Sequence, residues 1–284
     1  METRESRPFR TADLDAVNRH TWGLPATIRA YEHLNGWTDP GEQAALEYVA
    51  AEARSRPLLD IGVGTGRTTA LLQAISRNYV GIDYTREMVE ACRARHPDAC
   101  IVQMDARDLS AFDAGQFALV VFSFNGIDAV DLAGREQILR EVNRVLQPNG
   151  LFVFSAHNYG GPGYGERPSL HLPFSWNPLK LGWRSLKLAR SLPRSMINYR
   201  RYRVFDEWHP DWAIRNCAAH DFGIVVMYTT VAEQKRQLRE AGFTTELVLD
   251  NTGGHPVAEG ADTHGIWWFH YVARKIVKGA GYHC

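Results

Sequence analysis

The chain has 284 residues, enough for one α/β domain with a large insertion but not for two independent enzymes. It is 45% hydrophobic and 23% charged, a composition that is typical of folded globular proteins and argues against disorder. The 32 basic residues balance the 32 acidic residues, so the chain as a whole lacks the positive field of a nucleic-acid-binding protein.

The sequence contains no uncharged apolar run of the roughly 18 residues that a membrane-spanning helix needs. It opens METRESRPFR, which is polar and unlike a secretory signal, so we predict a cytoplasmic protein. Its cysteines are far apart and form no CxxC pair, which predicts reduced structural thiols and no metal site. They are Cys92, Cys100, Cys217 and Cys284.

Strands and helices alternate along the first half of the chain. A helix is predicted over 41–54, and further helices over 65–76, 85–96 and 135–146. Thr85 is positioned to cap the third of these helices, with Glu87 and Glu90 in its first turns. Near-continuous apolar strands are predicted over 57–61, 79–83, 100–105, 117–124 and 151–157. Strands without polar alternation are buried on both faces, as in a parallel sheet covered by helices.

The alternation stops at Tyr159 and resumes near Tyr228. Between them the chain is rich in Pro, Gly, Trp and basic residues, and no strand–helix rhythm is evident. A helix over 231–243 then precedes a strand over 244–250, which we expect to pair in hairpin fashion with a last strand over 266–275. We therefore expect a helical cap over 1–40, a core over 41–158 and 229–276, an inserted lid over 159–228 and a tail over 277–284.

The segment LLDIGVGTGRTT joins a buried strand directly to a glycine-rich turn and a helix. Gly62, Gly64 and Gly66 allow the backbone to turn sharply and to approach a ligand beside the free N–H groups of the helix. A dinucleotide-binding fingerprint places its third glycine three residues after the second, where this chain has Arg67. The three glycines here have the spacing GxGxG, and the acidic residue Asp60 precedes them. Both features differ from the dinucleotide-binding fingerprint and therefore disfavour a dehydrogenase.

These residues resemble the first motif of the class I S-adenosylmethionine-dependent methyltransferases, an acidic residue followed by x-Gly-x-Gly-x-Gly. The resemblance extends through GIDYTREM, MDARDL, FSFNGID and RVLQPNGLFVFS, so that ordered motifs cover residues 58–155. It implies a Rossmann-like sheet of seven mostly parallel strands, helices on both faces and a lid insertion after the fifth strand. It also implies S-adenosyl-L-methionine as the cofactor.

The resemblance assigns roles to residues at successive strand ends. Asp83 would accept both ribose hydroxyls, Met88 would pack on the adenine, and Asp105 with Ala106 would meet the adenine edge. The segment after the fourth strand would line the methionine half. The predicted cofactor residues are Tyr31, Asp60, Gly62, Gly64, Gly66, Asp83, Met88, Asp105, Ala106, Phe122 and Asn125. Each type alone is also typical of a structural turn or a helix cap, but parallel strands should bring Asp60, Asp83, Asp105 and Asn125 to one crevice.

Methyl transfer from a sulfonium needs alignment and exclusion of water, and a base only when the acceptor carries a proton. His157 closes the fifth strand on the cofactor edge and is the first candidate, although a histidine there can also simply bond loop backbone. His220, beside Asp221 at the end of the insertion, is the second candidate. Asp128 is the third, since a carboxylate in NGIDAV can instead satisfy backbone N–H groups.

All eight tryptophans lie outside residues 38–175, which favours an apolar lid over a small organic acceptor. Within 166–203, nine Lys or Arg accompany the single acid Glu166. Lys180, Arg184, Lys187 and Arg194 fall at helical spacing opposite Leu179, Trp183, Leu186 and Leu192, with Gly182 expected to interrupt that helix. A solvated outer face explains this pattern, and attraction of an anionic acceptor, RNA or a membrane surface are the alternatives.

We therefore predict a methyltransferase acting on an O or N atom of a small organic acceptor, with biosynthesis as its context. An RNA or protein methyltransferase that docks through the basic insertion is the alternative within the class. A catalytically silent cofactor-binding subunit is the alternative outside it. The Asn-Pro-Pro-Tyr type of sequence used for nucleic-acid amino groups is absent after the fourth strand, which argues against methylation of a base amino group.

Overall fold

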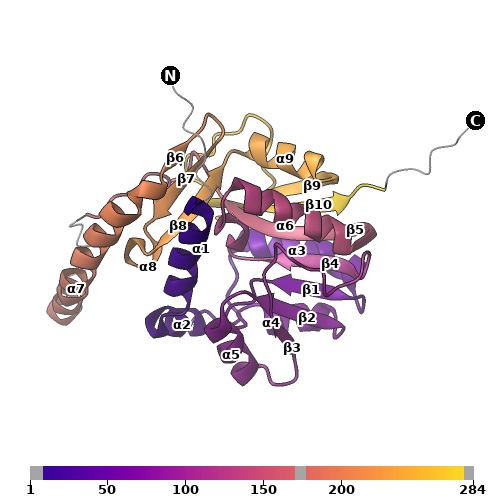
Figure 1. The fold of residues 1–284 in the computed structure, drawn as a ribbon, viewed down its shortest axis with the longest axis horizontal. Helices are drawn as coiled ribbons and strands as arrows, with labels where there is room; N and C mark the ends of the chain where they lie inside the picture. The colour runs from indigo at the N-terminus through magenta and orange to yellow at the C-terminus, as the bar shows by residue number, and fades with distance from the viewer. Residues whose placement is uncertain (1–8, 170–176, 278–284) are drawn as a thin grey trace, which may run out of the picture.

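The computed structural model describes residues 9–169 and 177–277 (Figure 1). Within these ranges a seven-stranded sheet has the order β3-β2-β1-β4-β5-β10-β9. Its strands are β1 (Leu58–Ile61), β2 (Tyr79–Asp83), β3 (Cys100–Gln103), β4 (Phe117–Phe122), β5 (Leu146–His157), β9 (Phe243–Asp250) and β10 (Trp268–Lys275). Strands β1 to β5 pair in parallel, whereas β10 is antiparallel to both neighbours. The predicted Rossmann-like fold is confirmed, including the pairing of the last two strands.

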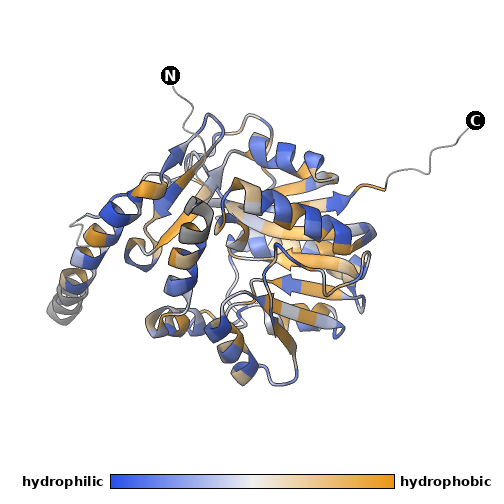
Figure 2. Ribbon diagram, in the orientation of Figure 1, coloured by the Kyte–Doolittle hydropathy of each residue, from blue (hydrophilic) through white to orange (hydrophobic). Residues whose placement is uncertain are grey.

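Helices cover both faces of this sheet. Leu59, Phe152 and Phe269 belong to a core that packs under α6 and α9 on one face. Leu58, Val121 and Val272 belong to a second core under α3, α4 and α5 on the other face. Figure 2 shows the hydrophobic strands enclosed by helices whose outer surfaces are hydrophilic. This arrangement explains why the strands lack polar alternation.

The helices α3, α4, α5, α6 and α9 begin and end within four residues of the predicted positions. The described helices are α1 (Phe9–Trp22), α2 (Pro25–Glu32), α3 (Pro40–Ala53), α4 (Thr69–Ile75), α5 (Arg86–Arg95), α6 (Leu132–Val145), α7 (Pro178–Tyr202), α8 (Ala219–Phe222) and α9 (Val231–Glu240), with short 3₁₀ turns η1 (Gly126–Asp128) and η2 (Arg203–Phe205). Asp39 caps α3 by accepting the Glu42 N–H at 2.9 Å. None of the described helices is long and apolar enough to cross a membrane.

The insertion contains strands, which the sequence analysis did not predict. Strands β6 (Glu207–Trp208), β7 (Trp212–Cys217) and β8 (Ile224–Thr229) form a separate antiparallel sheet beside α7. The strand IVVMYT is buried along its whole length, so it is apolar for the same reason as the strands of the main sheet. The predicted boundary near Tyr228 therefore falls inside a strand.

Two local predictions are also wrong. Gly182 does not interrupt α7, which continues from Pro178 to Tyr202. Thr85 occupies the cap position of α5, but its hydroxyl makes no cap hydrogen bond. The Asp83 carboxylate accepts the Thr85 N–H at 2.8 Å instead. The side chains of Lys180, Arg184, Lys187, Leu179, Trp183 and Leu186, and residues Trp176 and 278–284, lie outside what the structure describes.

Helix α1 joins the insertion to the main domain, and Figure 1 shows it between the two sheets. Asn18 is fully buried on this helix. Its amide donates to the carbonyl oxygens of Val225 (2.8 Å) and Ala129 (2.9 Å), and its oxygen accepts the Val225 N–H (2.9 Å). One side chain therefore satisfies backbone groups of β8 and of the loop that follows η1.

We expect Asn18→Ala to lower the free energy of unfolding by about 2–4 kcal/mol, because it leaves buried backbone donors and acceptors without partners. Urea denaturation at neutral pH measures this change. His20→Ala, on the exposed side of the same helix, is the control and should stay within about 0.5 kcal/mol of the parent. Equal stability of the two variants would show that α1 is not anchored through Asn18.

Candidate functional site

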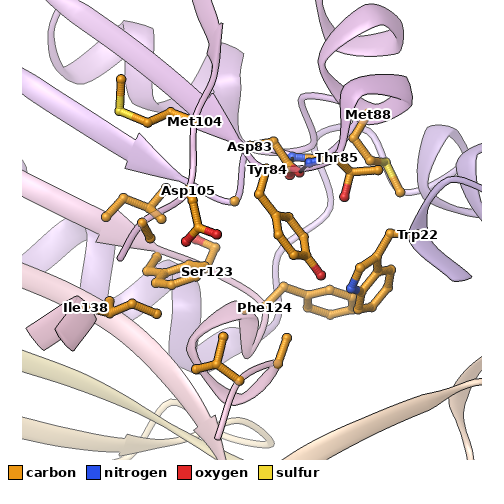
Figure 3. A pocket seen from close by; sticks show the side chains of 18 of the residues that line it. Trp22, Asp83, Tyr84, Thr85, Met88, Met104, Asp105, Ser123, Phe124 and Ile138 are labelled. Atoms are coloured by element: carbon orange, nitrogen blue, oxygen red, sulfur yellow. Dashed lines mark hydrogen bonds between the residues drawn. The ribbon is translucent and has the colours of Figure 1, made fainter. Parts of the chain in front are cut away.

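A cavity lies beyond the carboxyl ends of β1, β2 and β4 (Figure 3). The space between its walls, including the open mouth, is about 770 Å³. Eight of the eleven predicted cofactor residues line it. They are Tyr31, Gly62, Gly64, Asp83, Met88, Asp105, Ala106 and Phe122.

The glycine-rich turn forms one wall of the cavity. Gly62 and Gly64 have φ values of +65° and +56°, a region that favours glycine. A Cβ atom on Gly62 would lie 2.7 Å from the ring of Phe122, so this position has no space for a side chain. The Gly64 N–H donates to the Asp83 carboxylate at 3.0 Å. The turn is thereby fastened to the end of β2.

Asp83 is buried at the cavity wall, where it accepts the N–H groups of Gly64 and Thr85. Burial raises the pKa of Asp83 to about 6, and the two backbone hydrogen bonds oppose this rise. The hydroxyl of Tyr84 also belongs to a cavity residue, and it is buried without a hydrogen-bond partner among the described residues. Buried polar groups of this kind normally have partners, so the site fits a ligand that carries hydroxyl groups.

Apolar side chains line the cavity beside these polar groups. Figure 3 shows Met88, Met104 and Ile138 around its periphery and Tyr84 extending into it. Asp105 lies at the same wall, where Arg107 donates two hydrogen bonds to its carboxylate at 2.6 and 3.0 Å. Burial raises the pKa of Asp105, but the Arg107 hydrogen bonds and charge outweigh this effect and lower it. The cavity thus combines a polar wall with an apolar region suited to a flat ring.

The expected convergence of four polar residues on one crevice is wrong for two of them, since Asp60 and Asn125 are not among the described residues that line the cavity. Asp60 is only 1% exposed and accepts the Tyr79 hydroxyl at 2.8 Å. Side chains alternate along β1, so the residue before Ile61 points to the opposite face of the sheet. Burial raises the pKa of Asp60 to about 7, although the Tyr79 hydrogen bond opposes the change.

Gly66 does not line the cavity either. A Cβ atom there would lie 2.4 Å from the His96 ring, and its carbonyl oxygen is 3.1 Å from His96 Nε2. This glycine permits close packing of the turn against the end of α5.

The structure brings two of the candidate catalytic residues together. His157 Nδ1 lies 2.8 Å from Asp128 Oδ2, which also accepts the His157 backbone N–H at 2.6 Å. The other ring nitrogen, Nε2, is 3.5 Å from the Asn125 amide nitrogen, and the His157 side chain is 17% exposed. A carboxylate behind one ring nitrogen is the arrangement of a histidine that can accept a proton at the other. Neither His157 nor Asp128 is among the described residues that line the cavity, so the pair lies outside its wall.

His220 lies in a different environment from His157. It is the first of three consecutive residues with φ near +55°, and its ring stacks on Tyr31 at 5.7 Å and meets Trp22 edge-on at 5.2 Å. Burial lowers the pKa of His220, while the charge of Asp221 acts in the opposite direction. The insertion therefore contacts the helical cap through an uncharged aromatic ring near neutral pH.

Sequence reasoning missed several cavity residues, above all Trp22, Tyr84 and Phe124. Phe124 contacts Tyr31 and Trp37 edge-on at 6.0 Å each, and its backbone is left-handed. Tyr84 could have been predicted as a cavity residue, because it follows Asp83 directly at the end of a strand that borders the cavity. Trp22 reaches the cavity only through the docking of α1, for which the sequence carries no local signal.

Comparison with known proteins agrees with this geometry. Residues 58–150 match a family described as a methyltransferase domain. A probable S-adenosylmethionine-dependent methyltransferase of Mycolicibacterium smegmatis is 30% identical over 132 residues, 46% of this chain and 49% of that protein. The chain thus carries a class I S-adenosylmethionine-dependent methyltransferase domain. The cofactor of this domain is S-adenosyl-L-methionine.

Other similarities to this methyltransferase domain are more distant. An O-methyltransferase of Penicillium expansum is 29% identical over 154 residues, which cover 46% of this chain and 53% of that protein. The matches thus span about half the length of these relatives. A Burkholderia thailandensis 1,6-didemethyltoxoflavin-N1-methyltransferase with bound S-adenosylhomocysteine shares the fold at a TM-score of 0.59 and 14% identity, over 98% of this chain and 94% of that one.

The buried Asp60 makes the stability of the methyltransferase domain depend on pH. The folded-state pKa of about 7 exceeds the ordinary value of 3.8, so the unfolded chain loses this proton first and Asp60 destabilises the fold as pH rises from 4 to 7. Relative to the parent, Asp60→Asn should gain about 3–4 kcal/mol over this interval. Denaturant titrations at several pH values, with the exposed Asp98→Asn as control, measure it. A difference that does not vary with pH would contradict the prediction.

Proposed function

We propose that this protein transfers the methyl group of S-adenosylmethionine to an O or N atom of a small organic acceptor, with His157 as the base. The observation that carries the proposal is the Asp128–His157 pair, which follows β5 next to the strand that ends at Phe122 in the cavity wall. The bound cofactor supplies an activated methyl group on a positively charged sulfur, which leaves as a neutral thioether.

The cavity residues support a definite orientation of the cofactor. Asp83 would accept the ribose hydroxyls, and the hydroxyl of Tyr84, which has no partner among the described residues, is available to the same ligand. The apolar region around Met88 and Met104 suits the adenine ring. The turn at Gly62 and the ring of Phe122 would then border the methionine half.

His157 would act on the acceptor from the other side of the methyl group. The cofactor, held by Asp83 and the glycine turn, would supply its methyl carbon to the acceptor lone pair, and the electrons of the carbon–sulfur bond would stay on sulfur. The acceptor proton passes to His157 Nε2, and the imidazolium that forms is stabilised by Asp128. The proton and the charge are thus both accounted for within the site.

Aromatic side chains in and next to the cavity wall support a small acceptor. Trp22, Tyr31 and Phe124 come from the cap and from the core, and His220 comes from the insertion. We infer that the described parts of the insertion, residues 159–169 and 177–228, close over the acceptor together with the cap. The similar Penicillium expansum protein is named as an O-methyltransferase, and the didemethyltoxoflavin methyltransferase, which shares the fold, has a small molecule bound as its acceptor.

The function is tested by following S-adenosylhomocysteine release with a library of small phenols, alcohols, amines and N-heterocycles. Turnover of members of this library is the expected result. Methylation of total RNA or of protein extracts alone would favour the alternative in which the basic insertion is a docking surface. Tight S-adenosylhomocysteine binding with no turnover of any of these would indicate a cofactor-binding subunit.

Asp83→Asn should weaken S-adenosylhomocysteine binding at pH 8 by about 10- to 100-fold, the worth of charge-assisted hydrogen bonds. Because the pKa of Asp83 is about 6, the parent should also lose affinity as pH falls below 6, and the variant should not. Calorimetric titration measures both effects, with the exposed Asp108→Asn as control. Parallel pH profiles for parent and Asp83→Asn would rule out ionised Asp83 as the ribose ligand.

His157→Gln should lower kcat on an accepted substrate by about 10²- to 10⁴-fold, the usual contribution of a general base, with cofactor affinity nearly unchanged. His264→Gln, an exposed histidine, is the control and should keep full activity. A loss confined to acceptor KM would make His157 an anchor for the acceptor. Full activity of His157→Gln would refute its role and direct attention to His220.

A further inference from the structure

Behind Asp128 lies a second charged side chain, Arg135 of α6. Both side chains are completely buried, and Arg135 Nη1 donates to Asp128 Oδ1 while Oδ2 faces His157. Both carboxylate oxygens are therefore engaged, one by the guanidinium and one by the histidine. The three residues form a continuous chain of hydrogen bonds that begins at the fully buried guanidinium and ends at the partly exposed imidazole.

Local helix chemistry does not explain why an arginine occupies this position. Arg135 lies in the first turn of α6, where the helix dipole disfavours a positive charge. A fully buried ion pair is also weak evidence for a stabilising role, because desolvation of the two charges offsets their attraction. A residue that violates both rules is expected where function requires it.

The guanidinium is held from several directions. Besides Asp128, it donates to the carbonyl oxygen of Ile127 at 3.2 Å and to Gln237 Oε1 at 3.0 Å, and Nη2 donates to Gln234 Oε1. Gln234 and Gln237 belong to α9, about a hundred residues later in the chain. Arg135 is thus held by hydrogen bonds to η1 and to α9. Because its position is fixed, it also fixes the orientation of the Asp128 carboxylate.

This geometry determines where the proton resides on His157. A carboxylate has no proton to donate, so Nδ1 must donate to Asp128, which leaves the lone pair of neutral His157 on Nε2. Nε2 is the nitrogen that lies beside Asn125. If the carboxylate could rotate or take up a proton, the opposite tautomer would become accessible and Nε2 would no longer be available as an acceptor.

We propose that Arg135 is a positioning residue that keeps the Asp128 carboxylate oriented, and thereby holds His157 in the Nδ1–H tautomer. The role of that tautomer in catalysis rests on the proposed function, whereas the tautomer itself does not. The proposal can therefore be tested without knowledge of the acceptor.

The test uses the full chain labelled with ¹⁵N-histidine, and long-range ¹H–¹⁵N spectra that show which ring nitrogen carries the proton. Disappearance of one signal in His157→Gln assigns His157. Two variants are compared with the parent. Arg135→Met removes the positive charge and all the hydrogen-bond donors of the guanidinium, whereas Arg135→Lys keeps the charge but not the planar guanidinium. Arg144→Met is the matched control, because Arg144 lies on the same helix and holds Glu141 and two carbonyl oxygens away from the site.

In the parent we expect His157 protonated on Nδ1 with slow exchange of that proton. In Arg135→Met we expect a mixture of tautomers and exchange about tenfold faster, as for the loss of one charge-assisted hydrogen bond. Arg135→Lys should exchange at an intermediate rate, and Arg144→Met should match the parent. Parent-like His157 signals in folded Arg135→Met, or in folded Arg135→Lys if the Met variant does not fold, would overturn the proposal. Unfolding of both, with Arg144→Met folded, would assign Arg135 a purely structural role and overturn it equally.

Kinetics then separate this proposal from the proposed function. With an accepted substrate, Arg135→Met should lower kcat by up to about 100-fold while the KM for S-adenosylmethionine stays the same. If the His157 signals change in Arg135→Met while His157→Gln keeps full activity, Arg135 would still position His157, but His157 would not be the base. That result would refute the base assignment alone.

Discussion

The parallel register of β1 with its two neighbours is the constraint on which the site depends. Ile61 pairs with Ile82 on one side and with Phe122 on the other, so these strands end at nearly the same level. The residues that follow, Gly62, Asp83 and Ser123, consequently emerge at one edge and line one cavity. A shift of one residue in either pairing would turn these side chains to the opposite face of the sheet and separate the glycine turn from Asp83.

This edge was predictable from the sequence because its signals are local. Near-continuous apolar runs predicted the positions of β1, β2 and β4, and the resemblance supplied the roles of Asp83 and Met88. The direction of Asp60 was not predictable in the same way, because it depends on strand pleating and on Tyr79, whose hydroxyl it accepts from the neighbouring strand. An acidic residue at a strand end can face the ligand or the core, and only packing decides between them.

The catalytic half of the site depends on contacts that the sequence does not display. Asp128 and His157 were separate candidates, and their hydrogen bond required η1 to fold against the end of β5. In the sequence, Arg135 is one of several charged residues on an amphipathic helix. Its partners Gln234 and Gln237 follow the insertion, about a hundred residues later, so no local pattern connects them to it. The insertion itself was misjudged because its short strands are separated by unusual turns, including three successive left-handed residues at His220. Such turns persist only when the surrounding structure holds them.

Buried charge links the stability of the fold to binding. Burial raises the pKa values of Asp60 and Asp83 to about 7 and about 6, so both carboxylates destabilise the ligand-free fold when ionised. The two differ in what can relieve this cost. Among the described residues, the Tyr79 hydroxyl donates to the Asp60 carboxylate, which does not line the cavity, so a bound ligand cannot reduce the cost of its charge. Asp83 lines the cavity, so hydroxyl donors of a bound ligand can stabilise its charged form. Binding of such a ligand should therefore lower the pKa of Asp83 and stabilise the fold more at pH 8 than at pH 5, because the favourable hydrogen bonds form only with the carboxylate.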